Sequence, residues 1–212
     1  MTIIKQRAQR IGLFIDTQNL YHSAKRLFDA NVNFKKLIPD IIGERKLVRA
    51  FAYVITTESG EESTFFEALT NLGIETRTKD LQIFMDGVKK ADWDVGLAVD
   101  AIRLSNKLDA VVIFSGDGDF IPLVEYLKFN SGCQVEVVAF EKTTSTKLIE
   151  VVDDFFDISL HNTKYLIKKK NRQRKKQLST TNVSKIKVSK LKTNKVKIQK
   201  VPRKDIISKK KK

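Results

Sequence analysis

The chain has 212 residues and a formal net charge of +15, a length that suits one globular domain with a tail. Its single cysteine, Cys133, excludes an intramolecular disulfide and a cysteine zinc cluster, and two histidines argue against a Cys/His metal site. The longest apolar runs, such as residues 111–114, are far shorter than the roughly 18 residues that cross a bilayer, and no secretory signal opens the chain. We therefore expect a cytoplasmic protein with no membrane span.

The positive charge is confined to one end of the chain. Residues 1–160 hold 19 Lys and Arg against 24 Asp and Glu, a net charge of −5. Residues 161–212 hold 21 Lys and Arg against the single acid Asp205, a net charge of +20. All nine glycines and all thirteen phenylalanines lie before residue 161. We expect a globular domain over residues 1–160 and a Lys-rich tail over 161–212 that is disordered when free, because it has too little apolar surface to bury.

The predicted elements alternate between buried strands and amphipathic helices. The predicted strands are residues 11–15, 47–55, 74–78, 109–114 and 134–140. Two helices, 17–28 and 34–42, follow the first strand, and one helix follows each later strand: 62–72, 94–104, 120–130 and 144–152. This alternation predicts right-handed βαβ units and a mostly parallel sheet, which is an α/β fold.

Acidic residues lie where such a fold places its chemistry. Asp16 ends the first strand, Asp117 and Asp119 follow the fourth strand, and Asp94 opens a helix. If the strand order is 3-2-1-4-5, strands 1 and 4 are neighbours at the point where the order reverses, and ligands bind beyond the carboxyl ends of strands at such a point. Clustered carboxylates repel one another unless a cation neutralises them. Oxygen ligands suit Mg²⁺ or Mn²⁺, and such ions support phosphodiester hydrolysis.

Each acid also has a purely structural interpretation. Asp16 is suited to cap the following helix, the Gly-Asp-Gly-Asp sequence is a common turn composition, and Asp94 would stabilise a helix start through the helix dipole. Asp100 lies six positions after Asp94, about 120° around a helix, so we rank it only as a supporting metal ligand. The convergence of three separately placed motifs favours a functional site over these interpretations.

Three motifs together resemble those of the NYN domain, a group that includes the LabA-like proteins and belongs to the PIN-like nuclease superfamily. The motifs are FIDTQNLY at 14–21, KADWDVGLAVDA at 90–101 and SGDGDF at 115–120. Their order and spacing carry the resemblance, which covers roughly residues 8–160.

The resemblance implies a Mg²⁺- or Mn²⁺-dependent ribonuclease on a compact three-layer α/β/α sandwich. It implies that the metal-binding and catalytic acids are Asp16, Asp94, Asp117 and Asp119. It further implies that Asn19 helps to place metal or phosphate, and that Ser115 supplies a hydroxyl at the end of the fourth strand.

Three residues before the helix at 94–104 have two interpretations each. Lys89 and Lys90 would contact a phosphate of the incoming strand, or they are solvated surface lysines. Trp93 would stack on a base, or it packs the loop, and we favour packing.

The tail predicts an RNA partner, because each contact between its lysines and a nucleic-acid backbone releases counterions and makes affinity salt-dependent. An anionic membrane surface and an acidic protein are the alternative partners of the tail. Our first hypothesis is a metal-dependent ribonuclease, most simply an endonuclease, whose tail retains RNA near the acids. The alternative is a catalytically weak or silent RNA-binding or regulatory module of the same fold. The sequence leaves a homodimer open.

Overall fold

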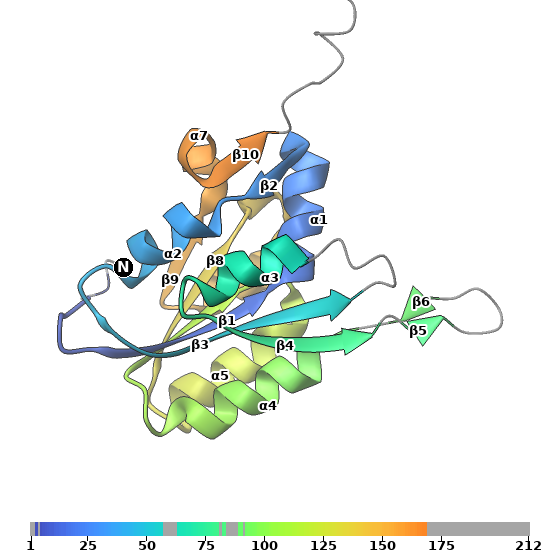
Figure 1. Ribbon diagram of the computed structural model, residues 1–212. Helices are drawn as coiled ribbons and strands as arrows, with labels where there is room; N and C mark the ends of the chain where they lie inside the picture. The colour runs from blue at the N-terminus through green and yellow to red at the C-terminus, as the bar shows by residue number, and fades with distance from the viewer. Residues whose placement is uncertain are drawn as a thin grey trace, which may run out of the picture. The chain divides into compact units, whose positions relative to one another are not determined.

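The computed structural model describes residues 3, 5–56, 63–80, 82–83, 89–90 and 92–168, which form a three-layer α/β/α sandwich (Figure 1). Its centre is a six-stranded sheet in which every neighbouring pair of strands is parallel. In spatial order the strands are β4 (Glu75–Asp80), β3 (Lys46–Thr56), β1 (Arg10–Asp16), β7 (Ala110–Phe114), β8 (Gln134–Ala139) and β9 (Asp154–Asp157). The predicted order of five strands is confirmed, and β9 adds an edge strand that was not predicted.

Helices cover both faces of the sheet (Figure 1). One face carries α1 (Thr17–Phe28), α2 (Phe34–Ile42) and α3 (Ser63–Thr70). The other face carries α4 (Asp94–Ser105), α5 (Ile121–Phe129) and α6 (Thr146–Val151). Single 3₁₀ turns precede α5 and α6, at η1 (Gly118–Phe120) and η2 (Glu141–Thr143). The described residues contain no helix of the length and apolarity that a membrane crossing requires.

Side-chain alternation along the strands divides the core into two layers. In β1, Leu13 and Ile15 point to the α1 face and Phe14 points to the α4 face, and all three are fully buried. Strands buried on both faces read as continuous apolar runs, which is why residues 11–15 were recognisable in the sequence. Ile15 pairs with Phe114 across β1 and β7, so the ends of these two strands lie next to each other.

The described chain continues beyond residue 160 as part of the folded body. After the 3₁₀ turn η3 (Ile158–His161), helix α7 (Asn162–Tyr165) leads into β10 (Leu166–Lys168), which pairs antiparallel with β2 (Ala30–Val32). Tyr165 is buried, and its hydroxyl donates to Asp40 Oδ2 at 2.8 Å. The hydrogen bonds and the buried ring attach the segment to α2. The rest of the tail predicted for residues 161–212 falls outside the described residues.

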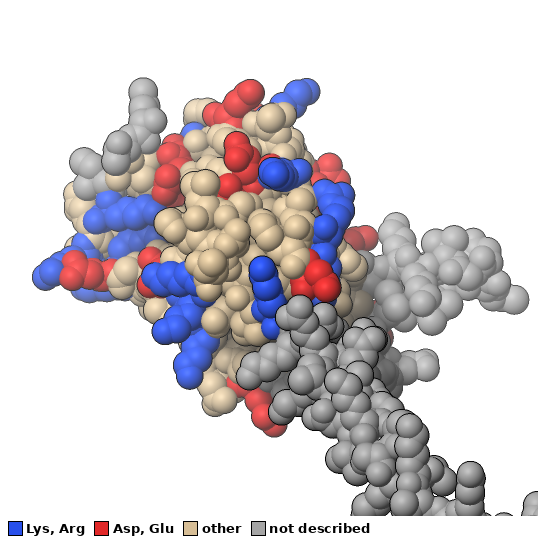
Figure 2. Space-filling view, turned by 90° about the horizontal axis from the view of Figure 1, so that it is seen from above, with Lys and Arg blue, Asp and Glu red and all other residues tan. Residues whose placement is uncertain are grey.

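Charges of both signs are interspersed on the face shown in Figure 2. Blue and red side chains alternate there with wide uncharged areas, and neither sign forms a continuous field. This face therefore shows no concentration of acids that would mark a site.

Candidate active site

A pocket of about 420 Å³ lies at the carboxyl edge of the sheet, the edge to which the arrowheads of β3 and β4 point in Figure 1. The end of β1, one side of α1, the end of β3, the start of α4 and the turns after β7 and β8 line this pocket. Four of the predicted site residues are among its lining residues: Asp16, Asn19, Asp94 and Asp117. The pocket therefore brings together three segments that are far apart in the sequence.

Asp16 is both a helix cap and a member of this acidic group. Its Oδ1 accepts a hydrogen bond from the backbone N–H of Asn19 at 3.0 Å, which caps α1, and its Oδ2 accepts from Ser115 Oγ at 3.1 Å. Burial raises the pKa of Asp16, and the carboxylate of Asp117 adds to the rise, while the hydrogen bonds oppose it. The capping interpretation is thus correct without displacing the functional one.

The turn after β7 is fixed by hydrogen bonds to Asp117 and to the first motif. Ser115 is fully buried, and its Oγ accepts from the backbone N–H of Asp117 at 3.3 Å. Asp117 Oδ1 accepts from the backbone N–H of Asp119 at 3.0 Å. The side-chain oxygen of Asn19 accepts from the backbone N–H of Gly116 at 3.1 Å. Asn19 and Ser115 therefore act as positioning residues that tie the two loops together.

The loop after β8 supports the same turn from behind. The backbone N–H of Ser145 donates to the carbonyl oxygen of Gly116 at 3.0 Å. A Cβ at Gly116 would lie 2.6 Å from Thr144 Oγ1 and 3.0 Å from Thr144 Cα, so this close approach requires glycine. Thr143 from this loop lines the pocket, and sequence reasoning did not find it.

Asp94 is the first residue of α4 and faces the other acids. Burial raises its pKa to about 6, and repulsion from Asp16, Asp117, Asp92 and Asp119 adds to the rise. A carboxylate that served mainly to stabilise the helix start would have a lowered pKa, because the helix dipole favours its charged form. Burial is the main cause of the rise, and the repulsion that adds to it shows that Asp94 lies near the other acids.

Trp93 packs the wall of the pocket. Its Nε1–H donates to the carbonyl oxygen of Val54 at 3.1 Å, and its ring centroid lies 5.6 Å from that of Tyr53. A Cβ at Gly96 would lie 2.6 Å from Trp93 Cε3, so the ring rests on the backbone of α4. These contacts agree with the packing interpretation of Trp93.

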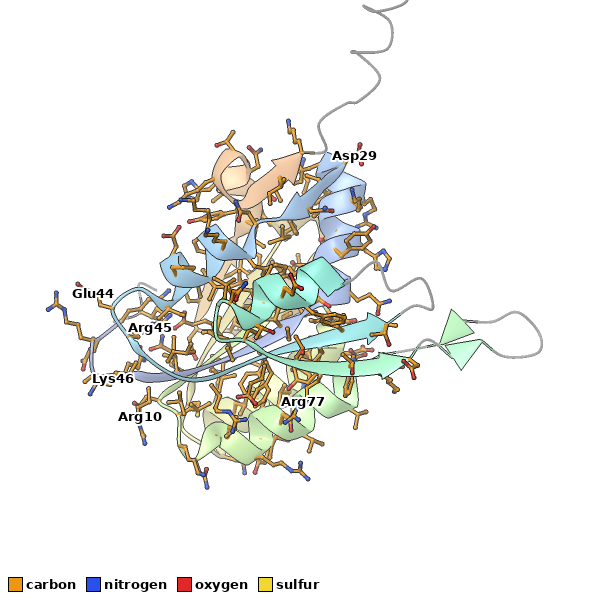
Figure 3. The ribbon with its side chains drawn as sticks, in the orientation of Figure 1. Arg10, Asp29, Glu44, Arg45, Lys46 and Arg77 are labelled. Carbon is orange, nitrogen blue, oxygen red and sulfur yellow. The ribbon has the colours of Figure 1, made fainter. Side chains whose placement is uncertain are left out.

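The other predicted residues lie outside the lining of the pocket. Asp119 is exposed at its rim, one residue into η1. Asp100 accepts from the Tyr53 hydroxyl at 3.1 Å and lies 3.5 Å from Arg77 Nε, which reaches toward α4 from β4 (Figure 3). Lys89 and Lys90 form the two-residue strand β6 (Lys89–Lys90), paired with β5 (Gln82–Ile83), and their side chains lie outside the described part of the structure.

The donor set has the chemistry that a hard divalent cation requires. All the acidic side chains of the site offer oxygen atoms, and repulsion among them adds to the raised pKa values of Asp16 and Asp94, for which burial is the main cause. Within the described residues, no three His, Cys, Asp or Glu side chains are already arranged to hold a metal ion. The oxygen donors of these carboxylates suit a hard divalent ion by type, but their described arrangement is not that of a formed metal site.

Asp94→Asn is expected to stabilise the metal-free protein at neutral pH. Since the pKa of Asp94 is raised from 3.8 to about 6, the folded state holds this proton more tightly than the unfolded chain. Ionisation of Asp94 therefore destabilises the fold at pH 7 and not at pH 4. Because Asp94 is half-exposed, we expect a gain of about 1 kcal/mol, or about 2–4 °C in Tm, at pH 7 in EDTA. Thermal unfolding followed by circular dichroism measures it.

The matched control is Asp29→Asn, which removes the same charge at the exposed C-cap of α1 (Figure 3). It should leave Tm nearly unchanged, because asparagine tolerates the left-handed backbone of Asp29, whose φ is 45°. The repulsion argument is wrong if Asp94→Asn lowers Tm at pH 7, or if its effect is the same at pH 4.

Comparison with known proteins gives a consistent match. The model of the NYN domain matches residues 10–160. The protein "Low amplitude and bright protein LabA" of Synechococcus elongatus is 28% identical over 164 residues, which are 72% of this chain and 86% of LabA. A crystal structure of a Vibrio parahaemolyticus protein of unknown function aligns with a TM-score of 0.70 at 30% identity, covering 78% of this chain and 100% of that chain.

Proposed function

The chain belongs to the NYN domain family, and on that premise we propose that it is a ribonuclease that hydrolyses RNA phosphodiester bonds with Mg²⁺ or Mn²⁺. The family is part of the PIN-like superfamily, whose members are typically nucleases and generally depend on divalent metal. We assign the metal to Asp16, Asp94, Asp117 and Asp119. Asp100 is left out of this set because Tyr53 and Arg77 engage its carboxylate.

One observation carries the proposal more than any other. Four carboxylates from three separate segments line one pocket, and two of them, Asp16 and Asp94, have raised pKa values to which repulsion from other acids contributes. A protein tolerates such crowding where a cation or a reaction uses it. Capping accounts for the orientation of Asp16 and of Asp117, but it does not explain why Asp94 lies close to both.

The residues of this chain have distinct tasks in such a reaction. When bound, a divalent ion polarises the phosphoryl oxygen and makes a bound water nucleophilic near neutral pH. Asp16 is held in a fixed orientation by the Ser115 hydroxyl and by the N-terminus of α1. Asp117 Oδ1 accepts from the backbone N–H of Asp119, and that hydrogen bond leaves Oδ2 unengaged. Asp119 is exposed, so it would hold the metal from the solvent side.

The basic tail has the charge to hold RNA near this site. The tail is rich in lysine and has one aromatic residue, Tyr165. We therefore infer that it contacts phosphates and binds RNA with little sequence preference. The tail side chains beyond residue 168 fall outside the described residues, so this inference rests on composition. An RNA-binding titration at rising salt measures the contribution, which should fall steeply.

The test of the nuclease proposal is metal dependence. Purified protein incubated with end-labelled single-stranded RNA should cleave it in Mn²⁺ or Mg²⁺ and leave it intact in excess EDTA. Adding the metal back in excess over EDTA should restore cleavage, which excludes irreversible damage by the chelator. Cleavage that persists in EDTA would contradict the metal mechanism.

A second candidate is an RNA-binding module of the same fold that cleaves slowly or not at all. Two observations favour it: Asp119 is exposed, and no three acidic side chains in the described part of the chain are arranged to hold a metal ion. This candidate predicts that RNA is bound and recovered intact in Mn²⁺, Mg²⁺ and EDTA alike.

A further inference from the structure

One wall of the pocket changes from acidic to basic along a single helix. Asn19, His22, Ser23 and Arg26 all line the pocket, and they occupy positions i, i+3, i+4 and i+7 of α1. Residues at this spacing share one helix face. The face starts beside the capping carboxylate of Asp16 and ends, about 10 Å along the axis, at the guanidinium of Arg26.

No described residue neutralises the positive charge of the Arg26 guanidinium. Its side chain is exposed, and in the described part of the chain no carboxylate lies within ion-pair distance of it. The preceding Lys25 differs, because its Nζ lies 3.6 Å from Asp29 Oδ1. The wall itself is fixed, since Thr143 Oγ1 donates to the buried Ser23 Oγ at 2.9 Å. Arg26 therefore extends from a rigid support with its charge available to a ligand.

A second cation lies on the other side of the acids. Lys79 of β4 donates from Nζ to the carbonyl oxygen of Asp92 at 3.1 Å, and its Nζ is 5.8 Å from the centroid of the Trp93 ring. Asp92 and Trp93 line the pocket. Trp93 packs in the core layer of α4, whereas α1 packs on the opposite face of the sheet. Arg26 and Lys79 thus flank the acidic centre from two sides.

We propose that Arg26 and Lys79 bind phosphate groups of the RNA strand on the two sides of the scissile phosphate. This inference rests on the proposed function. The acidic centre repels a phosphodiester strand, so the strand needs cationic contacts on its flanks to enter. The planar guanidinium of Arg26 can bind a phosphate with two parallel hydrogen bonds, and the Lys79 ammonium acts as a point charge. The folded domain then binds its substrate with Arg26 from the pocket lining and Lys79 beside that lining, in addition to the tail.

The experiment measures RNA binding separately from cleavage. Full-length protein carrying Asp117→Asn is titrated with a labelled single-stranded RNA of about eight nucleotides, in Mg²⁺, and followed by fluorescence anisotropy. Arg26→Gln and Lys79→Gln are added singly. The matched controls are Arg7→Gln and Lys107→Gln, which remove exposed charges at the opposite edge of the sheet, before β1 and before β7. The tail is the same in all variants and cancels in the comparison.

We expect Arg26→Gln and Lys79→Gln each to weaken binding about fivefold, which is the effect of one exposed charge contact. Each should also reduce the slope of log affinity against log salt by about 0.7, the value for one lost phosphate contact on a single strand. The two controls should keep the slope and the affinity of the Asp117→Asn parent.

Equal affinity and slope for Arg26→Gln, Lys79→Gln and the controls would overturn the inference. That result leaves the nuclease proposal standing, because the proposal depends on metal-dependent cleavage by protein with Asp117 intact. A weakened affinity in a protein that never cleaves RNA would sustain the inference for the second candidate function, and only the nuclease proposal would fall.

Discussion

Asp117→Asn is expected to lower the rate of RNA cleavage about 10²- to 10³-fold at saturating RNA and metal. Asparagine is nearly isosteric with aspartate, and its side-chain oxygen can still accept from the backbone N–H of Asp119, as Asp117 Oδ1 does at 3.0 Å. The turn after β7 therefore keeps its cap. The backbone N–H of residue 117 also keeps its hydrogen bond to Ser115 Oγ. The charge that holds the metal is the property that is lost.

Two controls make this result specific. Asp29→Asn changes the same functional group at the far end of α1, outside the pocket, and should cleave at the wild-type rate. Thermal unfolding of Asp117→Asn should show a Tm no lower than that of the wild type, because one member of a repelling group is neutralised. Wild-type cleavage by Asp117→Asn would sink the assignment of this acid, and a large loss in Asp29→Asn would show that the assay reports folding.

The centre of this site was predictable because it depends on strand ends. Asp16 and Asp117 each follow a buried apolar run, and the order 3-2-1-4-5 makes β1 and β7 neighbours. Since parallel strands end at the same edge, two acids about a hundred residues apart had to meet. Asn19 was predicted to help place metal or phosphate, and Ser115 only to supply a hydroxyl at the end of the fourth strand. Their hydrogen bonds to the neighbouring loop depend on loop geometry that residue type does not specify.

The α1 wall was also present in the sequence and was missed. His22 and Arg26 follow Asn19 at helical spacing, so a helical-wheel analysis of residues 17–28 would have placed them on the side of Asp16. Thr143 is different, because its position depends on the loop after β8 folding back on Gly116. No local pattern in residues 141–145 signals that contact.

The edge elements could not be predicted from local patterns. Strand β9 has the sequence DFFD, too short and too acidic to stand out as a strand. Strands β2 and β10 have three residues each and pair across more than a hundred residues of chain. Such a pairing depends on tertiary packing, here on the buried ring of Tyr165, and sequence periodicity does not predict it.

A buried ion pair was likewise hidden in the sequence. Glu136 belongs to β8 and shares its face with the core residues Val138 and Phe140, yet only 3% of its side chain is exposed. Arg45 follows α2, is 2% exposed, and binds both carboxylate oxygens of Glu136 (Figure 3). Arg45 also donates from Nη2 to the carbonyl oxygen of Ile41 at 2.7 Å. The pair joins the end of α2 to strand β8, which lies next to the edge strand β9.

Arg45→Met is expected to destabilise the protein by about 3 kcal/mol, a fall of about 6–12 °C in Tm at pH 7. Methionine at position 45 leaves Glu136 as a buried carboxylate without its arginine partner. The remaining described cation near it is Lys5, whose Nζ lies 3.2 Å from Glu136 Oε2. Lys5 is half-exposed and also pairs with Asp154. Lys5 offsets part of the loss, which is why we place the effect at the lower end of the range for a broken buried pair.

The double variant Arg45→Met/Glu136→Met separates the charge from the packing. Because both charges leave together, it should recover most of the stability that the single variant loses. Arg7→Met is the exposed control, since its pair with Glu44 is largely in solvent and should contribute at most about 1 kcal/mol. All three variants are compared by thermal unfolding at pH 7. If Arg45→Met unfolds at the same temperature as Arg7→Met, the buried pair contributes no more than a surface contact, and α2 is held to the sheet by its apolar side chains alone.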